Sequence, residues 1–154
     1  MEFNPAEVGI INRYIEKSLI FAEPISPTQV FLVEDKIDKQ AVVKKIIRKD
    51  RLLNAQAFKL AKQECEIHSL MNHSNIVKLF NYCETESDFH LYLEYCDKSS
   101  YLANKILDEH TTIGKKDKLI SYIQDILEGL SYIHRQGVIH EDIKLENILM
   151  KSPE

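Results

Sequence analysis

The stretch from Val138 to Leu149 constrains this chain most, because chemically distinct polar residues stand in it at fixed spacing between apolar flanks. Asp142 offers a carboxylate that can orient a hydroxyl and accept its proton. Lys144 offers a cation, and Asn147 offers an amide oxygen that can bind a metal ion. This combination favours phosphoryl transfer, although a polar loop between two short strands could have the same composition.

Composition and charge exclude several other classes of protein. The chain has 154 residues, 44% of them hydrophobic and 29% charged, so it is one soluble globular domain or a piece of a larger one. A net charge of −4 predicts no nucleic-acid or membrane-surface partner. No signal peptide or membrane-spanning run is visible. The three widely spaced cysteines indicate neither a disulfide framework nor a zinc site, so we expect an intracellular, cytoplasmic protein.

The first part of the chain reads as strands. Residues 14–20, 29–33 and 41–47 are rich in β-branched and aromatic residues, and the polar segment 35–39 predicts a hairpin between the last two. A helix follows at residues 54–71, with Asn54 as its N-cap.

Two more strands, 76–82 and 90–94, and a short helix at 102–107 precede a strongly amphipathic helix at 119–134. Gly137 predicts the C-terminal cap of that helix, and the catalytic-type loop and a last strand follow. The apolar stripe of the helix comprises Leu119, Ile123, Ile126, Leu127, Leu130 and Ile133. We expect a partner or self-association to cover this stripe.

Together, this order of elements and the loop resemble the eukaryotic protein kinase domain of the serine/threonine type. The resemblance runs from about Tyr14 to Leu149. It implies an α+β, protein-kinase-like fold, with an antiparallel N-lobe sheet and one helix followed by an incomplete helical C-lobe. The implied division is an N-terminal extension at 1–13, the N-lobe and hinge at 14–96, and the start of the C-lobe at 97–154.

On this resemblance, Ala41-Val42-Val43-Lys44 is similar to the V-A-I-K motif of the third strand. Lys44 would then contact the α and β phosphates of ATP, and Glu64 would be its partner. In isolation, Lys44 could be a solvated strand lysine, and Glu64 could simply lie on an exposed helix face.

The segment Leu91–Cys96 resembles the last N-lobe strand and the hinge, with Leu93 at the gatekeeper position. The residues that would enclose the adenine are Val30, Val42 and Leu149, together with the backbone from Glu94 to Cys96.

The resemblance implies transfer of the ATP γ-phosphate to serine or threonine of a protein substrate, with ATP and Mg²⁺ as cofactors. Asp142 would accept the proton, Lys144 would support the transferred group, and Asn147 would bind the metal. The alternative is a catalytically dead, pseudokinase-like module that binds a protein partner.

The chain departs from the family at the phosphate loop, where G-x-G-x-x-G is expected. Glu23, Ile25 and Thr28 stand at the glycine positions, and Pro24 and Pro27 lack an N–H group. We therefore expect weakened binding of the ATP phosphates.

Other departures concern regulation and the residues beyond the loop. Glu141 replaces an arginine that commonly receives an activation-loop phosphate. His68 stands where the family packs an aliphatic residue, so it is a mild defect or makes a buried polar contact. The sequence stops at Glu154, before any Asp-Phe-Gly, so we expect residues 1–154 alone to be inactive.

Overall fold

A computed structural model describes residues 5–96 and 116–150 of the protein. The chain divides into two compact units. The first contains residues 1–72 and 77–95, and the second contains residues 73–76 and 96–154. Each unit is described by itself.

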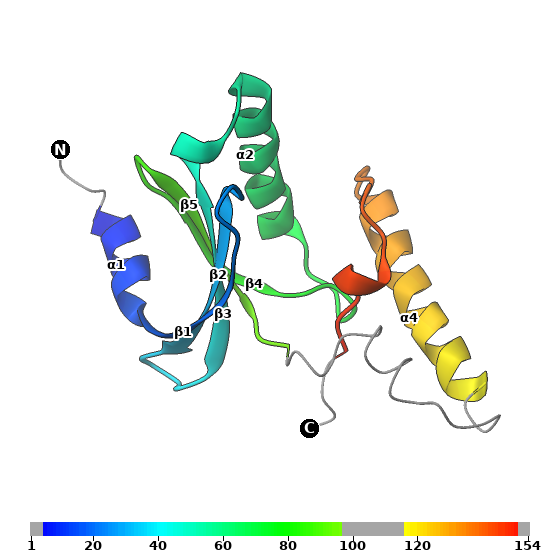
Figure 1. The fold of residues 1–154 in the computed structure, drawn as a ribbon. Helices are drawn as coiled ribbons and strands as arrows, with labels where there is room; N and C mark the ends of the chain where they lie inside the picture. Colours follow the sequence, from blue (N-terminus) through cyan, green and yellow to red (C-terminus); the bar gives the residue numbers. More distant parts are fainter. Residues whose placement is uncertain (1–4, 97–115, 151–154) are drawn as a thin grey trace. The chain divides into compact units, whose positions relative to one another are not determined.

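The first unit is built on a five-stranded antiparallel sheet with the strand order β1-β2-β3-β5-β4 (Figure 1). Its strands are β1 (Tyr14–Ala22), β2 (Thr28–Asp35), β3 (Ala41–Arg48), β4 (Leu79–Glu84) and β5 (Asp88–Glu94). The predicted antiparallel sheet is confirmed. The fourth strand begins at Leu79, three residues later than the sequence indicated.

The alternation of side chains along β3 decides which residues can meet. Successive side chains of a strand point to opposite faces of the sheet. Val42 and Lys44 therefore point to one face, and Val43 and Lys45 point to the other.

Helix α2 (Ala55–Leu70) covers the face to which Lys45 points. The Asn54 side chain accepts a hydrogen bond from the Ala57 N–H at 2.8 Å, so the predicted N-cap is confirmed. The core between helix and sheet consists of Ile47, Ala61, Cys65, Phe89 and Leu91. Burial of the three large side chains, Ile47, Phe89 and Leu91, contributes about 1.5–3 kcal/mol each, and this fixes α2 on the sheet.

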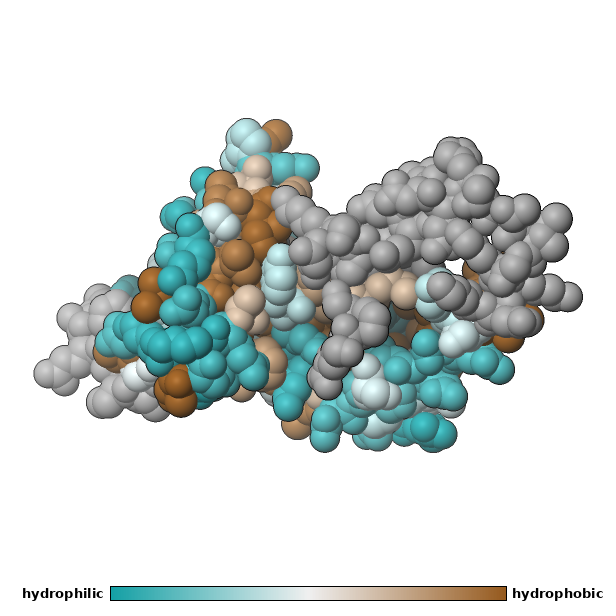
Figure 2. Space-filling model, turned by 90° about the horizontal axis from the view of Figure 1, so that it is seen from below, coloured by the Kyte–Doolittle hydropathy of each residue, from teal (hydrophilic) through white to brown (hydrophobic). Residues whose placement is uncertain are grey.

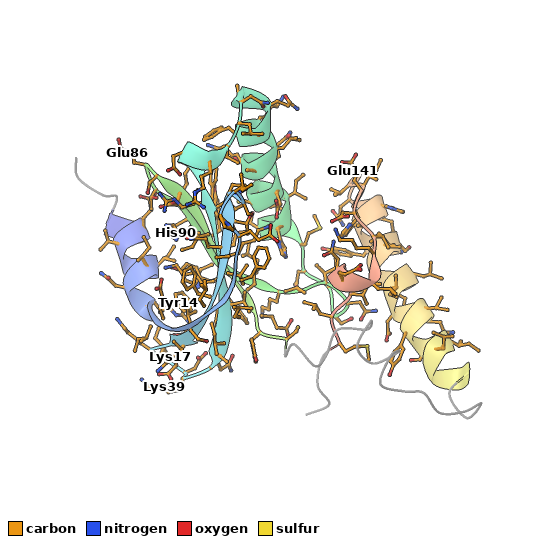
Figure 3. The ribbon with its side chains drawn as sticks, viewed as in Figure 1. Tyr14, Lys17, Lys39, Glu86, His90 and Glu141 are labelled. Atoms are coloured by element: carbon orange, nitrogen blue, oxygen red, sulfur yellow. The ribbon has the colours of Figure 1, made fainter. Side chains whose placement is uncertain are left out.

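The opposite face carries helix α1 (Pro5–Arg13), which the sequence did not predict (Figure 1). Ile10 and Ile11 of this helix pack on a core of Tyr14, Val33, Val42, Cys83 and Tyr92. The rings of Tyr14 and Tyr92 stack with centroids 4.0 Å apart. Figure 3 labels Tyr14 and His90, which point toward this side of the sheet.

In the second unit, the main element is α4 (Lys116–Arg135), which confirms the predicted amphipathic helix. Gly137 adopts a positive φ of 73°, and its N–H donates to the His134 carbonyl at 2.9 Å. The Val138 N–H donates to the Ile133 carbonyl, so the predicted C-terminal cap is also confirmed.

The segment 73–76 packs on α4 at Gly129. A Cβ atom at Gly129 would lie 3.0 Å from the Asn75 carbonyl oxygen, so any larger residue would require this backbone to shift by a few tenths of an ångström. The Asn75 side chain donates to the Asp125 carbonyl at 2.8 Å. The chain just before β4 is therefore attached to this helix.

Two expectations for the second unit have a different outcome. The loop itself contains a 3₁₀ helix at Leu145–Asn147. After it, the described residues form only a β-bridge at Leu149 and not the expected strand. The short helix expected at 102–107 lies outside the described residues. Within the described part of the chain, no helix is long and apolar enough to cross a membrane.

Candidate active site

Glu64 of α2 pairs with a lysine of β3, but this lysine is Lys45 and not the expected Lys44. The Lys45 Nζ lies 2.5 Å from the Glu64 Oε1. Lys44 instead lies 2.7 Å from the Glu16 Oε1 on β1. The expected pairing of Lys44 with Glu64 is wrong, because Lys44 points away from the face that α2 covers.

The structure gives Lys44 a different environment from that of Lys45. Its side chain is only 10% exposed, on the face covered by α1. A charge buried to this extent requires a partner, and Glu16 provides it. The sequence has lysine at both positions and isoleucine at 46 and 47, so a one-residue shift of register was not detectable.

The same correction applies to Val42, which was expected to contact adenine. Val42 is 2% exposed and belongs to the core beneath α1. On the other face, Val43 is paired with Leu93 across the strands, and Val30 is paired with Lys45. Val30, Val43 and Leu93 therefore share a face with Lys45 and form an apolar surface beside its ammonium group.

The residues expected in the hinge are divided between the two units. The Glu94 N–H donates to the Lys78 carbonyl at 2.8 Å, which attaches the end of β5 to the segment before β4. Cys96 and Leu149 belong to the second unit. The contact of these residues with adenine stays a prediction.

The β1–β2 loop, residues 23–27, leaves few donors for a phosphate. The Ser26 N–H donates to the Glu23 carbonyl at 3.2 Å, and the Thr28 N–H donates to the Ser26 Oγ at 3.1 Å. Pro24 and Pro27 have no N–H. From residue 23 to residue 28, at most Glu23 and Ile25 retain an N–H that a phosphate could use.

The loop singled out in the sequence is an ordered set of polar contacts around Asp142. The Lys144 Nζ lies 2.9 Å from the Asp142 Oδ2, and the Asn147 amide donates to the same oxygen at 2.8 Å. The Asn147 amide also donates to the Asp142 carbonyl at 3.0 Å. The structure therefore brings together all three predicted residues of this loop.

These contacts also set the charge states of the loop. The hydrogen bond from Lys144, and then that from Asn147, lower the pKa of Asp142. The same hydrogen bond to Asp142 raises the pKa of Lys144. Near neutral pH, Asp142 is ionised and Lys144 is protonated.

The backbone before Asp142 has an unusual conformation. Glu141, labelled in Figure 3, has a positive φ of 64°, which is uncommon for a residue other than glycine. The His140 side chain is exposed, and its Nδ1 accepts the Asp142 N–H at 3.3 Å. The His140 ring therefore helps to order this turn.

For a metal ion, Asn147 provides one ligand of the right kind. Its amide nitrogen is committed to Asp142, which leaves its Oδ1 as the atom for a cation. Mg²⁺ prefers six oxygen ligands, several of them water or phosphate oxygens. No cluster of three or more His, Cys, Asp or Glu residues exists in the described residues, so this unit fits Mg²⁺ only as a partial site.

His68 on α2 makes a polar contact, so of the two expected alternatives the mild packing defect does not apply. Its Nε2 lies 2.8 Å from the Val77 carbonyl oxygen. The contact attaches the last turn of α2 to the segment before β4, and α2 carries Glu64.

Comparison with known proteins agrees with this geometry, since residues 26–154 match the family described as the protein kinase domain. The chain belongs to the protein kinase family. Its similarity to individual kinases is moderate and spread over most of the chain.

Three curated relatives illustrate this similarity. MAP3K epsilon protein kinase 1 of Arabidopsis thaliana is 39% identical over 72% of the chain, which spans 8% of that protein. A probable myosin light chain kinase of Dictyostelium discoideum is 36% identical over 80% of the chain and 37% of its own length. CBL-interacting protein kinase 11 of Oryza sativa subsp. japonica is 32% identical over 82% of the chain and 24% of its length. The kinase chain described here thus spans well under half the length of these relatives.

Proposed function

We propose that the protein is a serine/threonine kinase that transfers the γ-phosphate of ATP to hydroxyl groups of a protein substrate. The observation that carries this proposal is the position of the Asp142 carboxylate, held by Lys144 and Asn147 in a kinase-type loop. The relatives named as kinases support the same class of reaction.

In this proposal, Asp142 orients the substrate hydroxyl and accepts its proton. Both side-chain contacts of Asp142 in the described residues fall on Oδ2, so Oδ1 is the oxygen available to the substrate. The lowered pKa keeps the carboxylate ionised, as a proton acceptor must be. Lys144 places a positive charge beside the same group.

ATP supplies the phosphoryl group when it is bound, and Mg²⁺ neutralises the charge on it. Lys45, oriented by Glu64, would bind the phosphates, and Val30, Val43 and Leu93 would contact the base. Asn147 would bind Mg²⁺. Leu149, Cys96 and the backbone of Glu94 stay proposed contacts to adenine.

The proposed domains follow from these roles. Residues 14–96 act as the N-lobe and hinge, and residues 97–154 begin the C-lobe. Residues 1–13 precede the N-lobe, and α1 extends the sheet core from there.

A second candidate is a kinase-like module that binds a protein partner without catalysis. The β1–β2 loop favours it, because this loop has lost most of the N–H groups that normally hold the phosphates. The intact set of Asp142, Lys144 and Asn147 favours the enzyme.

Phosphate transfer to a generic serine/threonine substrate tests the proposal. The assay should use the full-length protein, with any residues that its messenger RNA encodes beyond Glu154. Asp142→Asn should abolish transfer from radiolabelled Mg-ATP. Glu146→Gln is the matched control, because Glu146 is an exposed carboxylate of the same loop and its loss should leave activity intact.

Absence of transfer by the wild-type protein, together with binding of a protein partner, would favour the non-catalytic module. Transfer that survives Asp142→Asn would refute the assigned role of Asp142.

A further inference from the structure

The β1–β2 loop is closed by contacts that a glycine-rich loop does not have. In addition to the bonds of the Ser26 and Thr28 N–H groups, several carbonyl groups of the loop accept hydrogen bonds. The Pro27 carbonyl accepts the Arg48 N–H at 2.8 Å, which attaches the loop to the end of β3.

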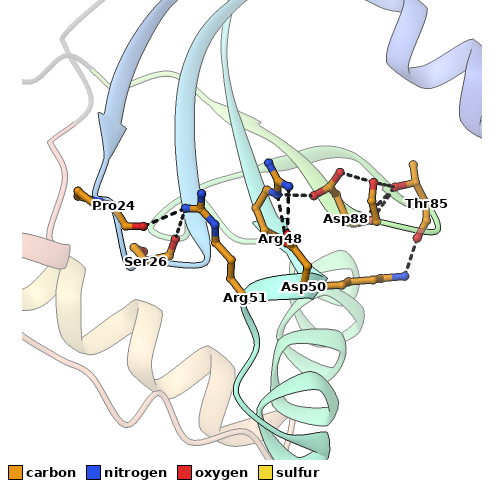
Figure 4. A network of polar contacts seen from close by, with 9 residues as sticks. Pro24, Ser26, Arg48, Asp50, Arg51, Thr85 and Asp88 are labelled. Carbon is orange, nitrogen blue, oxygen red and sulfur yellow. Dashed lines mark hydrogen bonds and ion pairs between the residues drawn. The ribbon is translucent and has the colours of Figure 1, made fainter.

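Arg51 binds two further carbonyl groups of the loop from outside it. Its Nη1 donates to the Ser26 carbonyl at 3.2 Å and to the Pro24 carbonyl at 3.4 Å (Figure 4). Arg51 lies at the end of the 3₁₀ helix Lys49–Arg51, between β3 and α2. One guanidinium group therefore bridges two carbonyl groups of a single loop that lies 25–27 residues away in the sequence.

Arg48, the other arginine of this network, binds carboxylates instead of loop carbonyls. The Arg48 side chain pairs with Asp50 at 3.2 Å and with Asp88 at 3.6 Å, and it does not contact the loop (Figure 4). Arg51 is thus the side chain of this network that binds the loop carbonyls.

We propose that Arg51 is a positioning residue that holds the β1–β2 loop closed before nucleotide binds. The proposal rests on the proposed kinase function. In a loop of glycines, N–H groups close on the phosphates when ATP arrives. Here, Arg51 fixes the carbonyl side of a loop most of whose N–H groups are absent or already bonded. The loop does not depend on the nucleotide for its order, and nucleotide selection passes to Lys45 and the apolar surface of Val30, Val43 and Leu93.

This inference predicts a loop that is equally ordered with and without ATP. Hydrogen exchange followed by mass spectrometry can measure the amides of Ser26 and Thr28 in a peptide that spans residues 22–29. In the wild-type protein, their exchange should be slow, and millimolar Mg-ATP should not change it. Arg51→Ala should speed it at least about tenfold, while peptides from α2 keep their wild-type exchange.

Two variants separate the role of Arg51 from a general loss of structure. Arg48→Ala removes an arginine of the same network without touching the loop, so it should leave loop exchange unchanged. Arg51→Lys retains a cation that can reach the carbonyl groups, so it should restore much of the protection.

The proposal is overturned if the wild-type loop becomes protected only when Mg-ATP is added, or if Arg51→Ala exchanges like the wild type. Failure of nucleotide binding is a separate outcome. A protein that binds no ATP but keeps a loop protected by Arg51 would refute the proposed kinase function and leave the positioning role intact.

Discussion

Two adjacent lysines of β3, Lys44 and Lys45, have different predicted roles. We expect Lys45 to bind nucleotide and Lys44 to have only a structural role, and exchanging each for methionine tests this. Lys45→Met removes the ammonium group beside Glu64, and Lys44→Met removes the one beside Glu16. Methionine retains most of the volume of the lysine stem, so packing on both faces of the sheet should change little.

The cost to stability should be small in both variants. Lys45 and Glu64 are 25% and 51% exposed, and a pair this accessible contributes at most about 1 kcal/mol. Lys44 is buried, but Glu16 is 52% exposed, so water can solvate the carboxylate that is left. Replacing a buried charge by an apolar side chain is often neutral or stabilising.

The effect on ATP should differ between the two variants. A hydrogen bond to a charged group contributes about 1.5–3 kcal/mol, which corresponds to a factor of about 10–150 in Kd. Lys45→Met should therefore weaken ATP binding by at least about tenfold, while Lys44→Met should leave it unchanged.

Isothermal titration calorimetry with ATP measures the affinities, and thermal unfolding of each variant checks the fold. If Lys44→Met weakens ATP as much as Lys45→Met does, the assignment of the two faces of β3 is incorrect. If neither variant changes ATP binding, then Lys45 is not a phosphate ligand.

Two further predictions concern pH and association. Burial, and then the charge of Lys44, lower the pKa of His90, while Asp88 and Glu16 act in the opposite direction. The unfolded chain therefore binds a proton at His90 more readily than the folded chain does. Neutral His90 contributes to the free energy of unfolding in full above the ordinary histidine pKa of about 6.5. This contribution is lost as the pH falls through the pKa of His90 in the folded chain. His90→Phe should flatten the dependence of urea unfolding on pH in this range, and an unchanged slope would contradict it. On α4, Ile123 and Leu127 are 47% and 58% exposed, and Figure 2 shows hydrophobic residues in brown at the surface among polar ones. Changing both to glutamate should convert a self-associating chain to a monomer on sizing chromatography with light scattering, whereas a wild-type monomer that binds no hydrophobic dye would rule out association.

Local signals in the sequence were sufficient for helices α2 and α4 and for the catalytic-type loop. The caps at Asn54 and Gly137 depend on hydrogen bonds within a few residues, so their side chain or backbone preference predicts them directly. The set of Asp142, Lys144 and Asn147 is also local, since six residues contain all three groups and a short turn brings them together.

Helix α1 was not predicted because little in its sequence requires a helix. It has nine residues, with Gly9 at its centre, and isolated helices of this length are marginal. Its stability comes from Ile10 and Ile11 packing on the sheet, and this contact exists only once the strands have assembled.

The sequence by itself determined that the chain carries a kinase-type loop, an antiparallel sheet and a helix that bears Glu64. Only the tertiary structure decided that Lys45 rather than Lys44 meets this glutamate, and that Arg51 closes the β1–β2 loop. Both facts depend on which face of β3 receives α2 and on contacts between residues far apart in the chain. A strand repeats every two residues, so a shift of one residue exchanges its faces, and with lysine at 44 and 45 and isoleucine at 46 and 47 the local pattern fits either choice.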